Sequence, residues 1–281
     1  MRLLATLHRW WGVAFCLLFA MWFASGIVMH FVPFPARSEA GRLGGSAGAN
    51  RAIGSAQDAL RLAAALVRSR GLDGSRATVA LIEYDQWTVA GNFNSDPLYR
   101  VALNDDAGTE LYVSSASGDV VLLTTQNMRL ANYFGSVAHW IYPAVLRHHA
   151  KVWSALMWWL SLIATFGVAV GVMIGVVRLG RGAPYRGLQR AHHIFGLVFA
   201  PFVLCWIFSG FLSMDDGWLF SDSLFRQLHT FDFPPLTSHP RVRSSLIVGL
   251  CLCGFAFSLT GVVLACRTLR AGPRGRRENA A

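Results

Sequence analysis

Residues 8–30 read HRWWGVAFCLLFAMWFASGIVMH, and this stretch decides the fold. From Trp10 onward it belongs to a run without Asp, Glu, Lys or Arg that extends over residues 10–36. About 20 apolar residues cross the hydrocarbon core of a bilayer, so the run is long enough for a membrane helix. Its length and the lack of a convincing cleavage site predict an uncleaved anchor rather than a signal peptide. The helix carries a histidine near each end, His8 and His30.

The same stretch recurs 184 residues further along the chain, where His192 takes the place of His8. Five more residues match in type at this shift: Gly12 with Gly196, Phe15 with Phe199, Trp22 with Trp206, Ser25 with Ser209 and Gly26 with Gly210. Apart from Ser25, the matched residues of the first copy fall on one face of a helix. A stretch that was merely apolar would not need this pattern, so we infer an internal repeat.

Four runs lack all four charged residue types: 10–36, 152–177, 194–214 and 244–266. Each is long enough to cross a bilayer. The ends of the second and fourth runs also match, although more weakly, since both contain a Gly-Val pair, Gly171-Val172 and Gly261-Val262. The repeat therefore predicts two parallel helical hairpins related by a pseudo-two-fold axis along the membrane normal. The predicted fold is a mainly α membrane protein, a four-helix transmembrane bundle with a small α+β domain inserted in the first hairpin.

The net charge of +10 is concentrated on one side of this topology. With the N-terminus in the cytoplasm, the cytoplasmic segments carry 11 of the 25 Lys and Arg residues but one of the 15 acids. This asymmetry follows the positive-inside rule and predicts a multi-pass bacterial inner-membrane protein with both termini cytoplasmic. The bilayer thus explains the basic composition better than a nucleic acid does. All five cysteines lie in the predicted helices, so no disulfide framework is expected.

The chain is predicted to consist of nine segments. The membrane helices occupy 1–34, 152–178, 192–214 and 244–266. The periplasmic side holds a domain over 35–131, an interfacial aromatic segment over 132–151 and a loop over 215–243. The cytoplasmic side holds a basic loop over 179–191 and a basic tail over 267–281.

The periplasmic domain is predicted to contain one helix and an antiparallel meander. The helix begins at Ser55-x-x-Asp58, which is typical of a capping box, and extends to about Arg70. Short alternating runs separated by turn residues predict five strands, over 78–84, 87–93, 99–103, 110–113 and 119–123.

This order of a helix followed by strands that close on Tyr112–Val120 resembles a PepSY domain. Other motifs resemble the PepSY-associated transmembrane family: Leu7–Trp10, His139–Pro143, Tyr185–Gly196 and Trp206–Met214. The resemblance covers nearly the whole chain. Members of that family include iron-regulated inner-membrane proteins and haem-carrying reductases of ferric siderophores. The resemblance therefore implies electron transfer toward the periplasm, with a possible part in iron uptake.

The repeat places His8 and His192 at the same depth near the cytoplasmic side. Two histidines related by a two-fold axis are suited to ligate a haem iron from opposite sides, so we predict a bis-histidine haem b here. Gly12 and Gly196 lie one turn deeper and leave room for a flat macrocycle. His193 is the alternative ligand, because helix ends are uncertain. Pairing with the haem propionates is expected from three arginines, Arg9, Arg186 and Arg190.

A second haem is predicted nearer the outer face, on His30. Its partner in the repeat is Met214, and the other candidates are histidines of the interfacial segment: His139, His148 and His149. The family motif points to His139. We expect His148 and His149 to form a solvated basic edge, and His229 and His239 to be ordinary loop residues.

The predicted function is electron transfer from a quinone or a cytoplasmic reductase through haem to a periplasmic acceptor, by resemblance a ferric siderophore. The cytoplasmic loop is too short for a nicotinamide or flavin domain. Because outer-sphere reduction needs no acid–base residues, none are assigned as catalytic. The alternative is a non-enzymatic membrane protein whose PepSY domain binds or regulates a periplasmic protein such as a protease. A proton-coupled transporter is disfavoured, because the four predicted helices contain no carboxylate.

Overall fold

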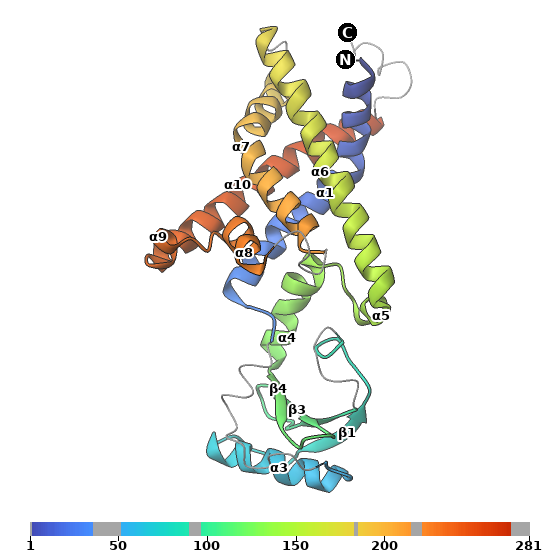
Figure 1. The fold of residues 1–281 in the computed structure, drawn as a ribbon, viewed down its shortest axis with the longest axis vertical. Helices are drawn as coiled ribbons and strands as arrows, with labels where there is room; N and C mark the ends of the chain where they lie inside the picture. The colour runs from blue at the N-terminus through green and yellow to red at the C-terminus, as the bar shows by residue number, and fades with distance from the viewer. Residues whose placement is uncertain (1, 36–51, 90–96, 183–184, 215–220, 271–281) are drawn as a thin grey trace. The chain divides into compact units, whose positions relative to one another are not determined.

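The computed structural model describes residues 2–35, 52–89, 97–182, 185–214 and 221–270. The chain forms two compact units, which Figure 1 shows. One comprises Met1–His30 and Lys151–Ala281 and is called the helical unit. The other comprises Phe31–Ala150 and is called the inserted unit. The mainly helical fold with a small inserted α+β unit confirms the predicted fold class.

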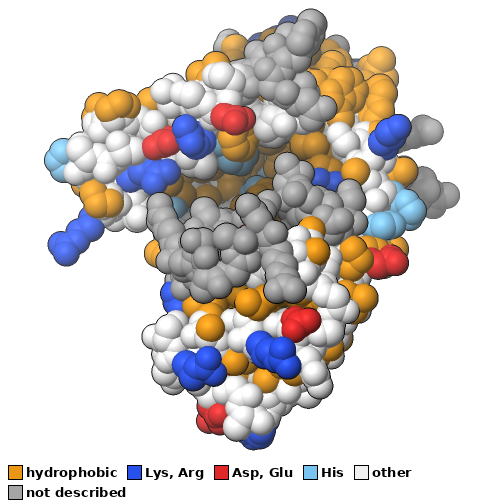
Figure 2. Space-filling model, turned by 60° about the horizontal axis from the view of Figure 1, so that its bottom comes forward, with side chains coloured by type: hydrophobic (Ala, Val, Ile, Leu, Met, Phe, Trp, Pro, Cys, Tyr) orange, Lys and Arg blue, Asp and Glu red, His pale blue; other side chains and the backbone are white. Residues whose placement is uncertain are grey.

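The helical unit contains four helices that are long and apolar enough to cross a bilayer. They are α1 (Arg2–Phe31), α6 (Ala150–Gly180), α7 (Gly187–Leu212) and α10 (Pro240–Arg270). The protein is therefore a multi-pass membrane protein. Many large apolar side chains of these helices are exposed. Figure 2 shows hydrophobic side chains, in orange, on the face of the molecule seen there. Lipid is the solvent that suits such a surface.

All four helices begin before the charge-free runs that predicted them. The helix α10 begins four residues before its predicted start at 244 and continues to Arg270, four residues past its predicted end. The predicted ends were placed at the first charged residues. An arginine at the end of a membrane helix can keep helical backbone geometry while its long side chain reaches the polar interface, so charge marks the interface rather than the helix end. The tail beyond Arg270 lies outside the described residues.

The four helices pack through aromatic side chains and glycines. Phe23 of α1 lies 6.1 Å from Phe199 and 5.7 Å from Trp206 of α7, ring centre to ring centre. A Cβ atom added to Gly254 of α10 would lie 2.5 Å from this same Phe23 ring. The absence of a side chain at Gly254 thus lets α10 approach α1.

We expect Gly254→Ala to destabilise the protein by about 1–3 kcal/mol, because the new methyl group overlaps the Phe23 ring in a packed core. Thermal unfolding in detergent measures the change. The control is Gly249→Ala on the same helix, where an added Cβ meets no atom within 4 Å. The control should be neutral or stabilising, because alanine favours a helix more than glycine does. Equal unfolding temperatures for the two variants would contradict the packing argument.

The segment between α7 and α10, predicted as a periplasmic loop over 215–243, includes short helices in its described part. It contains α8 (Asp222–Thr230) and α9 (Pro234–Thr237), and α10 already begins at Pro240. The Ser221 hydroxyl caps α8 by accepting a hydrogen bond from the backbone N–H of Leu224 at 3.3 Å. At the other end, the Arg243 guanidinium donates to the carbonyl oxygens of Thr230 and Phe231. Both ends of α8 are therefore satisfied.

The inserted unit is a four-stranded antiparallel meander covered on one face by a helix. The strands are β1 (Thr78–Ile82), β2 (Leu98–Ala102), β3 (Glu110–Ser114) and β4 (Val120–Thr124), in the order β1-β2-β3-β4. The helix α3 (Ala56–Ser69) places Ala59, Ala63, Leu66 and Val67 on the sheet residues Val101, Leu111 and Val113. Ser55 caps α3 as predicted, accepting from Asp58 N at 3.2 Å.

The predicted strand over 87–93 is not present in its described part. Residues 87–89 form a turn instead, and residues 90–96 lie outside the described residues. The Asp85 carboxylate accepts hydrogen bonds from the backbone N–H groups of Trp87 and Thr88, at 2.8 and 3.1 Å. These side-chain bonds replace the ladder bonds of a strand.

The predicted interfacial segment over 132–151 is built from short helical pieces. The helix α4 (Gln126–Asn132) continues into the π-helical turn η1 (Tyr133–Val137), and α5 (Ala144–His148) follows. Asn132 is fully buried, donates to Pro33 O and accepts from the Ser136 hydroxyl. The contact of this segment with a membrane surface stays a prediction.

Candidate functional site

A cavity of about 1180 Å³ lies among the four long helices of the helical unit. Its lining includes His8 of α1 and both His192 and His193 of α7. It also includes residues from the last turns of α6 and α10. The structure therefore brings the three predicted inner histidines to one cavity, although they lie far apart in the sequence.

His8 projects from α1 onto a glycine of α6. A Cβ atom on Gly171 would lie 2.5 Å from Cε1 of His8, so only glycine leaves room for the imidazole there. Trp11 lies one turn further along α1, stacked on His8 at 6.0 Å, and donates from Nε1 to Ile163 O at 3.1 Å. The Nδ1 atom of His8 is buried and has no hydrogen-bond partner among the described residues. A buried nitrogen without a partner is costly and is therefore a candidate to bind a ligand.

His192 is held in one tautomer by Thr260 of α10. Its Nδ1 atom lies 2.7 Å from the Thr260 hydroxyl oxygen. That hydroxyl already donates its hydrogen to Phe257 O at 2.6 Å, so we assign the Nδ1–H of His192 as the donor to Thr260. The Nε2 atom then carries a lone pair, and no hydrogen bond within the described part of the chain uses it. Metal-ligating histidines commonly show this pattern, with the other ring N–H bonded to a protein acceptor.

The repeat seen in the sequence is also a repeat of contacts. His8 meets Gly171 of α6, and the equivalent His192 lies near Gly261 of α10, whose added Cβ would be 3.7 Å from Cε1. Each histidine thus faces a glycine on the second helix of its own hairpin. This agrees with two hairpins of the same design.

His193 is placed differently from its neighbour. Its Nε2 atom lies 2.8 Å from Gly175 O, and a carbonyl can only accept, so Nε2 carries the proton. The buried Nδ1 atom has no partner among the described residues. The nitrogen that His193 leaves without a partner is therefore Nδ1, as at His8, whereas His192 leaves Nε2. His192 is therefore better prepared than His193 to ligate through Nε2.

The glycines and arginines predicted around the histidines are only partly equivalent. A Cβ on Gly12 would meet no atom within 4 Å, whereas one on Gly196 would lie 3.3 Å from the Phe257 ring. Space for a flat ligand is thus open beside α1 and occupied beside α7. Arg9 and Arg186 line the cavity, but Arg190 is not among its lining residues.

A stripe of glycines on α6 was not singled out from the sequence. Gly167, Gly171 and Gly175 follow each other at intervals of four, so they share one helix face. Added Cβ atoms there would overlap or crowd the side chains of Trp11, His8 and Leu197. Small residues at this spacing are typical of close packing between membrane helices, so the spacing was the available signal.

The cavity offers donors and lining residues of the kinds that a haem uses. Three imidazoles offer unpartnered nitrogens, at His8 Nδ1, His192 Nε2 and His193 Nδ1. No group of three or more His, Cys, Asp or Glu side chains able to hold a bare metal ion occurs in the described ranges. A haem brings four nitrogen ligands of its own and needs one or two from the protein. The arginines and apolar walls of the cavity suit its propionates and its macrocycle.

The candidates for an outer site belong to different units. His30 lies in the helical unit with its Nε2 atom 2.9 Å from the Ser244 hydroxyl, and Met214 follows α7 in the same unit. His139, His148 and His149 belong to the inserted unit. His148 stacks on Tyr84 with ring centres 4.2 Å apart and meets His149 edge-on at 5.4 Å. An outer haem site stays a prediction.

His229 was predicted to be an ordinary loop residue, and the structure corrects this. It lies in α8, and its Nδ1 atom is 3.0 Å from the hydroxyl of Ser209 in α7. Its backbone carbonyl accepts from Nε1 of Trp206 at 2.9 Å. Burial lowers the pKa of His229 to about 4. The spacing of Phe225 and His229, one turn apart after the cap at Ser221, was the available signal for an amphipathic helix.

Acidification is expected to destabilise the contact between α8 and α7. The folded pKa of His229 lies below the ordinary value of 6.5, so the unfolded chain binds the proton more readily and stability falls as the pH drops from 6.5 toward 4. Between pH 7 and pH 5 this group alone contributes a loss of about 2 kcal/mol. Unfolding temperatures at the two pH values, in wild type and His229→Gln, measure it.

The His229→Gln variant should lose less stability between pH 7 and pH 5 than the wild type does. The control is His239→Gln, which replaces an exposed histidine and should keep the wild-type pH dependence. If His229→Gln and His239→Gln show the same pH dependence, His229 is not the titrating group.

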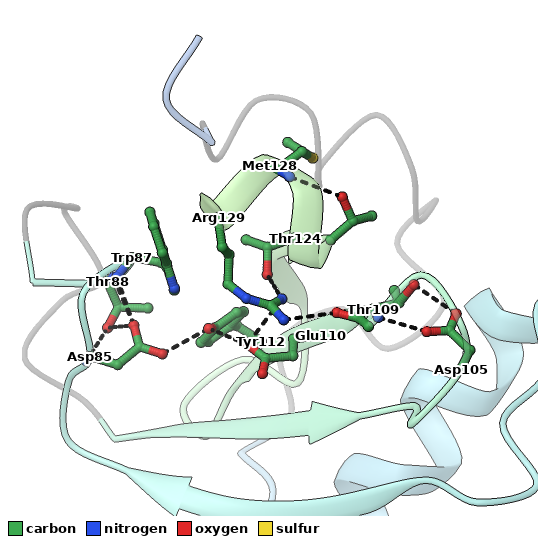
Figure 3. Close-up of polar contacts among 12 residues, drawn as sticks. Asp85, Trp87, Thr88, Asp105, Thr109, Glu110, Tyr112, Thr124, Met128 and Arg129 are labelled. Carbon is green, nitrogen blue, oxygen red and sulfur yellow. Dashed lines mark hydrogen bonds and ion pairs between the residues drawn. The ribbon is translucent and has the colours of Figure 1, made fainter. Parts of the chain in front are cut away.

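The inserted unit contains a buried polar cluster on the face of the sheet opposite α3 (Figure 3). The hydroxyl of Tyr112 lies 2.7 Å from an Asp85 carboxylate oxygen and 3.0 Å from one of Glu110. Arg129 of α4 pairs with Glu110 at 3.3 Å and donates to Thr124 at 2.9 Å. Burial raises the pKa of Tyr112 far above its usual value, so the hydroxyl remains a donor. Because Tyr112 is fully buried, we interpret the cluster as the structural link between α4 and the sheet.

Comparisons of the chain with models of protein families, with curated proteins and with solved structures found no match. The resemblance to the PepSY-associated transmembrane family therefore rests on the sequence motifs themselves.

Proposed function

We propose that this chain is a haem-carrying electron-transfer protein of the inner membrane, similar to the PepSY-associated transmembrane family. One observation carries the proposal. His8 and His192, equivalent in the repeat, line one cavity, and each presents an imidazole nitrogen without a hydrogen-bond partner among the described residues. Bis-histidine ligation of a haem b uses this donor set.

His8 and His192 would hold the haem iron, and Thr260 would orient His192 through its hydrogen bond to Nδ1. Arg9 and Arg186 would pair with the propionates, since both line the cavity. A bound haem supplies a centre that takes up and releases one electron. The chain itself supplies the two ligands, the cationic rim and apolar walls that keep water away.

The electron acceptor proposed is ferric iron in a siderophore, and the donor is a quinol or a cytoplasmic reductase. The family resemblance supports the acceptor. The excess of arginine on one side supports cytoplasmic termini and a periplasmic inserted unit. Electrons would therefore leave toward the periplasm.

The absorption spectrum of the purified protein tests the proposal. After expression with adequate haem supply, the wild type should show a Soret band that shifts on reduction with dithionite. His8→Ala and His192→Ala should each abolish the bis-histidine signal, because each removes one axial ligand. His193→Ala is the matched control and should retain the bis-histidine signal.

A protein without a Soret band would overturn the haem proposal and favour the alternative of a PepSY protein that regulates a periplasmic partner. Loss in His193→Ala with retention in His192→Ala would move the ligand by one residue.

Thr260→Val should weaken haem binding about 10- to 100-fold, because a ligating histidine that loses its hydrogen-bond acceptor also loses its fixed tautomer and orientation. Titration of the haem-free protein with haem measures this, and the reduction potential should change with it. Thr165→Val on α6 is the control, since Thr165 lies outside the cavity lining and its hydroxyl donates within its own helix, to Ser161 O at 2.8 Å. Equal affinities in the two variants would rule out the orienting role of Thr260.

A further inference from the structure

The rim of the inner cavity carries five arginines, drawn from all four long helices: Arg2, Arg9, Arg178, Arg186 and Arg267. No Asp or Glu occurs among its described lining residues. The ion pairs between described residues involve other arginines, namely Arg61, Arg129 and Arg226. The rim is therefore a concentration of positive charge without a counter-ion among the described residues, which favours an anionic ligand.

Arg178, at the end of α6, is the arginine whose position points most directly to a ligand. Its Nε atom is buried and has no hydrogen-bond partner in the described part of the chain. The guanidinium carbon lies over the Tyr185 ring, 5.9 Å from its centre, and this stacking holds the side chain beside the start of α7. A buried guanidinium nitrogen without an acceptor costs free energy unless a ligand satisfies it.

The N-terminus of α7 adds further donors at the same place. The N-cap residue Arg186 makes no side-chain capping bond, and the next three residues, Gly187, Leu188 and Gln189, line the cavity. The first N–H groups of a helix have no intrahelical acceptor and carry partial positive charge. Together with Arg178, they form an arrangement that is suited to a phosphate group.

We propose that this rim binds the phosphate of an anionic phospholipid, held by Arg178, by the N-terminus of α7 and by Arg2 and Arg267. Apolar walls continue from the rim into the bundle, where Leu197 and Val203 line the same cavity, so an amphiphile suits it better than a small anion does. The rim lies at one end of the four candidate membrane spans, where the headgroups of lipids are expected. Arg9 and Arg186 remain for the haem propionates, and the lipid site does not require haem.

Native mass spectrometry of the detergent-purified full chain tests this proposal. The probes are phosphatidylglycerol and phosphatidylcholine with the same acyl chains, and inorganic phosphate. The wild type should retain phosphatidylglycerol in preference to phosphatidylcholine. Arg178→Gln should weaken the affinity for phosphatidylglycerol about tenfold, as expected for one charge-assisted hydrogen bond. The matched control is Arg181→Gln, three residues away, exposed and outside the cavity lining, and it should bind like the wild type.

Equal effects of the Arg178→Gln and Arg181→Gln substitutions, or equal retention of the two lipids, would overturn the proposal. If inorganic phosphate binds as tightly as phosphatidylglycerol does, and if this binding also requires Arg178, the ligand is a soluble phosphate instead. If Arg178→Gln fails to fold, Arg267→Gln takes its place with the same expectation. His192→Ala separates this proposal from haem binding, because it should lose the Soret band and keep the preference for phosphatidylglycerol.

Discussion

The contact of each inner histidine with a glycine on the neighbouring helix determines how the helical unit packs. An imidazole needs room, and in a bilayer it also needs a partner for each polar nitrogen, because lipid tails offer none. Gly171 provides the room for His8, because an added Cβ would lie 2.5 Å from its ring. The contact at Gly261 is looser, since an added Cβ there would lie 3.7 Å from His192, at ordinary contact distance. The hydrogen bond to Thr260 fixes the proton of His192 on Nδ1. The Nε2 atom then keeps its lone pair and can bind a ligand. The cavity and its donors result from these close approaches.

The aromatic residues of α1 extend the same packing toward the middle of the bundle. Trp11 fits against Gly167 of α6, and Phe23 fits against Gly254 of α10. The contact between a glycine on one helix and an aromatic ring on the next thus occurs at several depths along the bundle. Close packing of this kind replaces the hydrophobic effect as the source of cohesion between helices in lipid.

The sequence was sufficient for the large features of the fold. A run without charge predicts a membrane helix because few other structures accommodate one, and the shift of 184 residues places His8 and His192 in equivalent positions. Local patterns could not reveal contacts that depend on tertiary packing. The burial of His229 depends on α8 folding back onto Ser209, and the loss of the strand at 87–89 depends on hydrogen bonds to the Asp85 side chain. The choice between His192 and His193 required knowing which acceptor each ring nitrogen meets.

The place of the inserted unit in the chain affects the order in which the bundle can assemble. His192 and Gly261 are separated by a short stretch of chain, whereas the whole inserted unit is translated between His8 and Gly171. During synthesis α1 therefore waits for α6 while the inserted unit is made, which is longer than α7 waits for α10. The later hairpin closes over a shorter loop and can form soon after its second helix emerges. The hairpin of α1 and α6 is thus expected to form more slowly after synthesis of its first helix than the hairpin of α7 and α10 does.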